Sequence, residues 1–203
     1  MFKPLPYIIT YLMESTIEKV KTLCLFFIFS TGCSVAVCQD LIIPEPALQS
    51  AIARSLGVRE QDLSKSLVEK NLTRLQANDL GIRDLSGLEH AKNLESLVVR
   101  DNLIDDLSPI QKLSKLNNLD LSGNRLKDLS SLVSLPGLSV SSAHSTANHS
   151  ALRILNLSRN RLLGLSGIEH FRSLAQLDVS ENSLIDLEGV GKLNELVNLY
   201  AQG

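Results

Sequence analysis

The chain has 203 residues, a formal net charge of -2 and 4% aromatic residues, with no Trp. This length is enough for one sizeable hydrophobic core, and the core must be built from aliphatic side chains. Lys and Arg are scattered among Asp and Glu without a basic block, so we expect no nucleic-acid partner. All 3 cysteines precede residue 40. Residues 41–203 therefore hold no disulfide, no thiolate metal site and no cysteine nucleophile.

Residues 1–38 have the pattern of an export leader. Lys19 and Lys21 precede the apolar run LCLFFIF, and small residues follow it. This order is typical of a secretory signal, and Met13 is an alternative start to Met1. The apolar stretch is shorter than the roughly 20 residues of a membrane-spanning helix. We therefore expect contact with a membrane only through the leader or a lipid anchor.

Two cleavage positions fit this leader. The segment FSTGC resembles a bacterial lipobox, and the resemblance implies cleavage before Cys33, whose sulfur would carry the lipid. The alternative is ordinary cleavage after Cys38, with Ala36 and Cys38 as the small residues. An uncleaved anchor is the third possibility. The product is accordingly expected to be exported, as a cell-envelope lipoprotein or a secreted protein.

Residues 41–71 predict a helical N-terminal cap. In IPEPALQSAIARSLG, Pro46 stands at a helix start and Gly57 at its end. Leu48 and Ile52 fall on one face, together with Leu56. The segment QDLSKSLVEKN follows as a second short apolar-faced element. Such a cap covers the first open face of a repeat stack.

From Leu72 the chain repeats every 22 residues with the pattern L-x-x-L-x-L-x-x-N, which is that of the leucine-rich repeat. Alternating leucines such as Leu119 and Leu121 predict a short strand. Leucines spaced by three, such as Leu126 and Leu129, suit a 3₁₀-like or extended return arc. Residues 72–203 thus predict an α/β repeat solenoid, a leucine-rich-repeat horseshoe with a short parallel sheet on its concave face. The expected strands are 74–77, 96–99, 118–121, 154–157, 176–179 and 198–200.

The stretch SVSSAHSTANHSA, residues 139–151, interrupts the period. Leu138 and Leu152 are 14 residues apart instead of 22, and the stretch lacks inward leucines. We expect residues 138–151 to form an exposed loop that leaves the stack uninterrupted, with the Leu116 repeat beside the Leu152 repeat. A binding role is the alternative for this loop, because long loops often carry function.

Two polar columns recur with the period and predict structural roles. The aligned asparagines can satisfy the backbone where each strand turns away, because an amide both donates and accepts hydrogen bonds. The aligned aspartates are expected to cap turns. The two columns are Asn102, Asn124, Asn160 and Asn182, and Asp84, Asp106, Asp128 and Asp186.

No metal or cofactor is expected. His90 and His170 share one repeat position, but three repeats of about 4.8 Å separate them by roughly 15 Å, too far for one metal ion. His144 and His149 have no acidic or cysteine companion nearby.

The strands of a leucine-rich repeat line its concave side, where the side chains between the inward leucines form a surface called here the strand wall. These side chains are a mixed polar set without a Ser-His-Asp arrangement, a phosphate-binding glycine loop or paired carboxylates, so we expect no enzyme. The predicted partner-binding residues are Arg74, Gln76, Ser96, Val98, Arg100, Asn118, Asp120, Ile154, Asn156, Gln176, Asp178 and Tyr200.

The helix IPEPALQSAI, the segment LTRLQANDLGIRDLSGLEHAKNL and repeats ending in DLSPI together resemble the internalin-type bacterial leucine-rich-repeat proteins. The resemblance covers residues 41–203 and implies a secreted or surface-attached recognition module. We therefore expect a non-catalytic module that binds a protein or a glycan through the strand wall. The alternative is the recognition segment of a larger receptor or enzyme.

Overall fold

The computed structural model describes residues 41–133 and 152–203, all within the structural unit Leu41–Gly203. The predicted leader, with Cys33 and Cys38, and the predicted loop at 138–151 lie outside the described residues. Among the described residues, no helix has the length and apolar character needed to cross a membrane.

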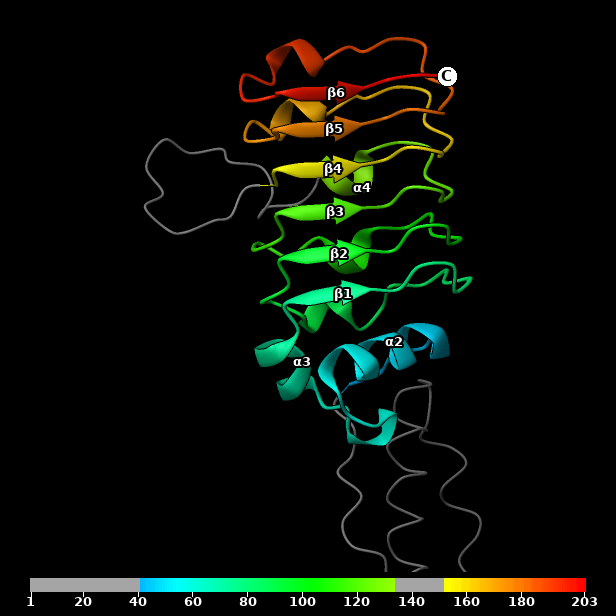
Figure 1. Cartoon of the computed structure of the whole chain (residues 1–203), viewed down its shortest axis with the longest axis vertical. Coiled ribbons are helices and arrows are strands. Elements are labelled where there is room, and N and C mark those ends of the chain that lie inside the picture. The colour runs from blue at the N-terminus through cyan, green and yellow to red at the C-terminus, as the bar shows by residue number, and fades with distance from the viewer. Residues whose placement is uncertain (1–40, 134–151) are drawn as a thin grey trace, which may run out of the picture. The chain divides into compact units, whose positions relative to one another are not determined.

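Two helices lie at the N-terminal end of the stack (Figure 1). Helix α2 (Pro46–Leu56) begins at Pro46 and ends before Gly57, which adopts a left-handed conformation with φ 67°. Its buried face includes Leu48, Ala51 and Ile52. Helix α3 (Lys65–Asn71) begins after Ser64, whose hydroxyl accepts a hydrogen bond from the Leu67 N–H at 3.3 Å. Helix α2 contacts both α3 and the first strand, so its apolar face joins the core of the repeats.

Six short strands form one parallel sheet in chain order, which confirms the predicted repeat solenoid (Figure 1). Each strand pairs with the next without a slip in register, so one leucine per strand aligns through the whole stack, from Leu75 to Leu199. All six predicted strands are present, and the first five are one residue shorter than predicted. The strands are β1 (Arg74–Gln76), β2 (Ser96–Val98), β3 (Asn118–Asp120), β4 (Ile154–Asn156), β5 (Gln176–Asp178) and β6 (Asn198–Tyr200).

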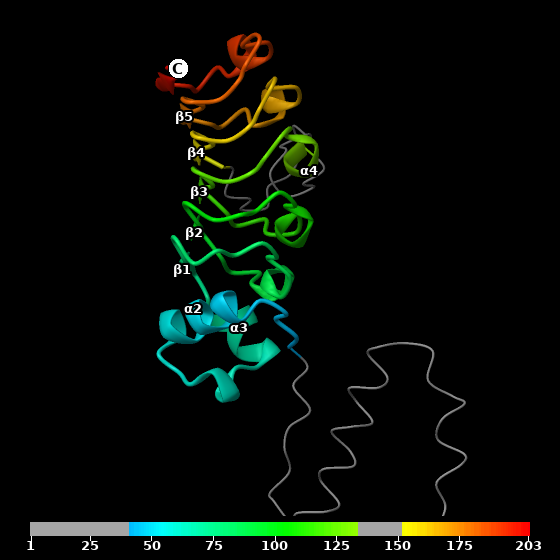
Figure 2. The same ribbon diagram turned by 90° about the vertical axis from the view of Figure 1, so that its right-hand side faces the viewer.

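The return arcs lie on the side opposite to the strands (Figure 2). Most are 3₁₀ turns, as the three-residue leucine spacing predicts, but the repeat that begins at Leu116 carries a short α-helix instead, α4 (Ser130–Val133). The 3₁₀ turns are η3 (Leu88–His90), η4 (Ser108–Ile110), η5 (Ile168–His170) and η6 (Val190–Lys192), and a further one, η2 (Glu60–Asp62), precedes α3.

The core is a continuous aliphatic column between the strands and the return arcs. Leu97, Leu119, Leu155 and Leu177 have no exposed surface, and Phe171 is the one aromatic side chain among the buried residues of the described segments. Because each turn of the chain buries its leucines against the next, the repeats stabilise one another rather than folding singly.

The insertion does not interrupt the stack. Strand β3 pairs directly with β4, with Leu119 beside Leu155, although 36 residues rather than 22 separate these two leucines. This pairing confirms that the Leu116 and Leu152 repeats are neighbours.

Candidate partner-binding wall

The parallel register sets the residues of the strand wall in two straight rows across the sheet. The first row runs from Arg74 through Ile154 to Asn198, and the second from Gln76 through Asp120 to Tyr200. Neighbouring members of a row are about 4.8 Å apart, the spacing of paired strands. The wall is therefore a regular lattice of mostly polar side chains on one parallel sheet.

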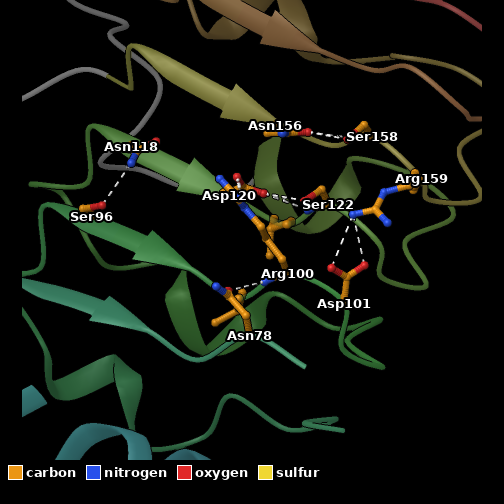
Figure 3. Close-up of polar contacts among 12 residues, drawn as sticks. Asn78, Ser96, Arg100, Asp101, Asn118, Asp120, Ser122, Asn156, Ser158 and Arg159 are labelled. Atoms are coloured by element: carbon orange, nitrogen blue, oxygen red, sulfur yellow. Dashed lines mark hydrogen bonds and ion pairs between the residues drawn. The ribbon is translucent and has the colours of Figure 1, made fainter. Parts of the chain in front are cut away.

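Hydrogen bonds to nearby serines hold three side chains of the second row in place. Asp120 Oδ1 accepts hydrogen bonds from the backbone N–H and the hydroxyl of Ser122, at 3.1 and 2.8 Å. Asn156 Oδ1 binds the same two groups of Ser158, at 2.9 and 2.8 Å (Figure 3). Asp178 Oδ1 accepts from the Ser180 N–H at 3.0 Å. These local bonds hold the side chains in one conformation, which lowers the entropy lost when a partner binds.

One ion pair crosses the middle of the wall. The Arg100 Nε lies 2.7 Å from Asp120 Oδ2, and the Asp120 side chain is only 8% exposed whereas that of Arg100 is 51% exposed (Figure 3). Arg100 thus covers the carboxylate and keeps much of its own surface free for a partner. The backbone N–H of Arg100 also donates to Asn78 Oδ1 at 3.0 Å.

The predicted wall residues differ in how much surface they offer. Val98 and Asp120 lie on the wall but are buried, because neighbouring strands and the Arg100 side chain leave little of them exposed. Ile154 and Tyr200 are 41% and 44% exposed, and they are the large apolar side chains that the wall presents to solvent. Interface energy commonly concentrates in such anchors together with arginine.

The four aligned asparagines lie just past the strand ends and bond the backbone of adjacent repeats. Asn124 Nδ2 donates to the carbonyls of Val99 and Leu121, both at 2.9 Å, while its Oδ1 accepts from the Ile104 N–H at 3.1 Å. Asn160 Nδ2 likewise donates to the Leu121 carbonyl, and its Oδ1 accepts from the Leu126 N–H. The column of asparagines therefore continues past the insertion. Each amide thereby joins its repeat to the preceding one at the point where the strand ends.

The aligned aspartates cap the following turn, as their position predicts. In each case the carboxylate Oδ1 accepts the backbone N–H two residues later, at 2.7 Å for Asp84 and 3.0 Å for Asp186. Asp106 also accepts the Ser108 hydroxyl at 2.6 Å, and this bond lowers the pKa of the Asp106 carboxyl below its ordinary value. The Ser130 hydroxyl lowers the pKa of Asp128 in the same way.

Beside the wall, an ion pair that the sequence pattern does not predict joins two repeats that are not neighbours. Arg159 Nη2 lies 3.1 Å from Asp101 Oδ1 (Figure 3). Gly123 occupies the same position in the repeat between them. A Cβ on Gly123 would lie 2.2 Å from Asp101 Oδ1. The absence of a side chain at Gly123 therefore leaves the space that the Asp101 carboxylate occupies. The signal in the sequence is a single glycine in a column that otherwise holds Asp79, Asp101, Arg159 and Glu181.

The described residues contain no group of three or more His, Cys, Asp or Glu side chains arranged to hold a metal ion. The wall itself offers hydrogen-bond donors and acceptors, one accessible guanidinium over a carboxylate, and two apolar anchors. This arrangement suits recognition of another surface.

No protein-family model matches the chain, and no curated protein matches its sequence. Among solved structures, internalin C2 of Listeria monocytogenes is similar at 27% identity and a TM-score of 0.60, covering 83% of this chain and 80% of that one. An internalin (InlF) of the same organism is similar at 24% identity and a TM-score of 0.59, and this chain covers 49% of it. The functional domain of L. monocytogenes InlJ, which includes a cysteine ladder, is similar at 24% identity and a TM-score of 0.56, with 36% of it covered. With the capping helices, the 22-residue register and this structural likeness, residues 41–203 form an internalin-type leucine-rich-repeat solenoid.

Proposed function

We propose that the protein is an exported, non-catalytic module that binds a protein or a glycan through the strand wall. The observation that carries the proposal is the internally bonded wall, in which Arg100, Ile154 and Tyr200 are accessible on a rigid sheet. The likeness to internalin C2 supports a repeat solenoid of this type. The wall side chains carry two positive and two negative charges, so we expect recognition by shape and hydrogen bonds, with electrostatic steering a minor contribution.

The decisive experiment compares two matched variants in partner capture from surface extracts and on a glycan array. The wall variant combines Ile154→Ser with Tyr200→Ala, which removes both accessible anchors. The control combines Leu163→Ser with Arg161→Ala, because Leu163 is 59% exposed but lies outside the wall. We expect the control to retain the captured partner and the wall variant to lose it by tenfold or more. Equal retention by both variants would contradict the proposal.

The proposed route to the cell surface is the predicted leader, with Cys33 as the lipid-bearing residue. In a bacterial host, Cys33→Ala is expected to abolish labelling by a fatty-acid probe and to release or misprocess the protein. Unchanged labelling would exclude the lipid anchor. A soluble product that begins at Gln39 would indicate ordinary secretion instead.

A further inference from the structure

The charges of the solenoid separate onto its two edges. The strand-start edge comprises the residues just before each strand, 68–73, 90–95, 112–117, 152–153, 170–175 and 192–197, and it contains seven Lys or Arg against three Glu. The strand-end edge comprises residues 79–86, 101–108, 123–130, 159–166 and 181–188, and it contains nine Asp or Glu against five Lys or Arg. The chain as a whole has a charge of only -2. Folding therefore gathers positive charge along one edge, at the tails of the strand arrows in Figure 1.

A cation precedes each of the six strands on this edge. These cations, one to six residues before their strand, form the line: Lys70, Lys92, Lys115, Arg153, Arg172 and Lys192. At about 4.8 Å per repeat, the line extends over roughly 24 Å. Two of its members make hydrogen bonds across repeats, from Lys92 Nζ to Glu69 at 2.8 Å and from Lys115 Nζ to Asn93 at 2.6 Å.

The positive charge is densest in the middle of the edge. Residues 112–117, 152–153 and 170–175 contain Lys112, Lys115, Arg153 and Arg172 and no acidic residue, and all four side chains are exposed. Backbone hydrogen bonds hold Arg153 between the Leu116 and Leu174 repeats. Its N–H donates to the Asn117 carbonyl, and its carbonyl accepts from the Ala175 N–H, both at 2.9 Å. Within the described part of the chain, Lys112, Arg153 and Arg172 form no ion pair, so their charge is available to a ligand.

We propose that the strand-start edge binds a linear polyanion whose charged groups are sulfate or phosphate esters and which carries no bases. A row of cations with one member before each strand matches a chain of anionic groups better than it matches a compact acidic surface. Among the described residues of the edge, the one Phe, Tyr or Trp ring, Phe171, is buried, so none of these rings is exposed for a base to stack on. This inference goes beyond the proposed function, since it concerns a surface other than the strand wall and a ligand bound chiefly by charge.

The test uses the full 203-residue chain and two triple variants that remove the same charge. The edge variant is Lys112→Gln, Arg153→Gln and Arg172→Gln. The control on the strand-end edge is Arg125→Gln, Lys127→Gln and Arg161→Gln. Binding of a heparin oligosaccharide, as the sulfate probe, and of poly(glycerol phosphate), as the phosphate probe, is measured by calorimetry at two salt concentrations. Circular dichroism melting curves establish that both variants remain folded.

We expect the unmodified chain and the control to bind at least one probe, more weakly at high salt, and the edge variant to lose tenfold or more. The probe that binds identifies sulfate or phosphate as the preferred group. Equal losses in both variants would overturn the inference, because binding would then follow net charge alone. Failure of the unmodified chain to bind either probe, or tighter binding of a single-stranded oligodeoxynucleotide, would also overturn it. None of these outcomes depends on the partner of the strand wall.

Discussion

At the scale of single residues, the asparagine column carries more of the stability than its small side chains suggest. Asn124 is 6% exposed and bonds four backbone groups that are themselves buried. We expect Asn124→Ala to lower the free energy of unfolding by about 2–3 kcal/mol, because the substitution leaves those groups without partners. Asn182→Ala is the matched control and should cost less, since Asn182 is half-buried at the C-terminal end. Urea denaturation measures both, and a larger loss at Asn182 would show that the column does not act as described.

The turn-capping aspartates give the stability a dependence on pH. The pKa of Asp106 and that of Asp128 are lowered in the folded protein from an ordinary 3.8, chiefly by the Ser108 and Ser130 hydroxyls. A carboxyl with a lowered folded pKa stabilises the fold fully above its ordinary pKa, and the contribution disappears as the pH falls through the folded value. Stability should therefore decline below about pH 4, by a modest amount because both groups are largely exposed.

The double variant Asp106→Asn with Asp128→Asn tests this assignment. Each amide oxygen still accepts the turn N–H, but neither group titrates. Urea midpoints measured between pH 6 and pH 3 should fall less steeply for the variant than for the unmodified chain. Parallel pH curves would assign the acid sensitivity to other groups.

At the scale of the repeat, the turn after each strand requires a left-handed residue. Asp79, Asp101, Arg159 and Glu181 all have φ 54°, and Gly123 has φ 68° at the same position. A left-handed conformation is unfavourable for residues with a Cβ, so its recurrence shows that the geometry of the repeat overrides local preference. Gly123 relieves that strain in one repeat, and it also leaves space for the Asp101–Arg159 pair.

Gly123 and Gly81 form a natural pair for separating these two roles. Both have a positive φ, of 68° and 67°, but an added Cβ meets nothing within 4 Å at Gly81 and lies 2.2 Å from Asp101 Oδ1 at Gly123. Gly81→Ala should therefore report backbone strain alone. Gly123→Ala should be more destabilising by about 1 kcal/mol or more in urea denaturation, because the carboxylate must move away from Arg159. Adding Asp101→Ala to Gly123→Ala should remove that excess, and equal effects of the two glycine substitutions would argue against the clash.

At the scale of the whole molecule, the architecture follows from a few repeated positions. Leucines at fixed offsets predict the strands, and Pro46 and Gly57 predict the bounds of the first capping helix, because each residue type has a conformational reason to stand there. The sequence does not reveal the positive edge, since the six cations of its line lie 19 to 38 residues apart in the chain and come together only when the repeats stack. The sequence does not predict the burial of Asp120 either, because that burial depends on Arg100 from the preceding repeat.

The strand wall requires one uninterrupted stack of repeats, and deletion of residues 138–151 tests this most directly. The deletion joins Gly137 to Leu152 and restores the 22-residue period, which the direct pairing of β3 with β4 permits. We predict that the variant folds with an unchanged or slightly higher thermal midpoint, since a shorter loop has less entropy to lose, and that it retains any partner captured by the wall. A thermal midpoint several degrees lower would contradict the account, because the deleted segment would then be part of the folded stack. Normal folding with loss of the partner would contradict it as well, since the segment rather than the wall would carry the binding.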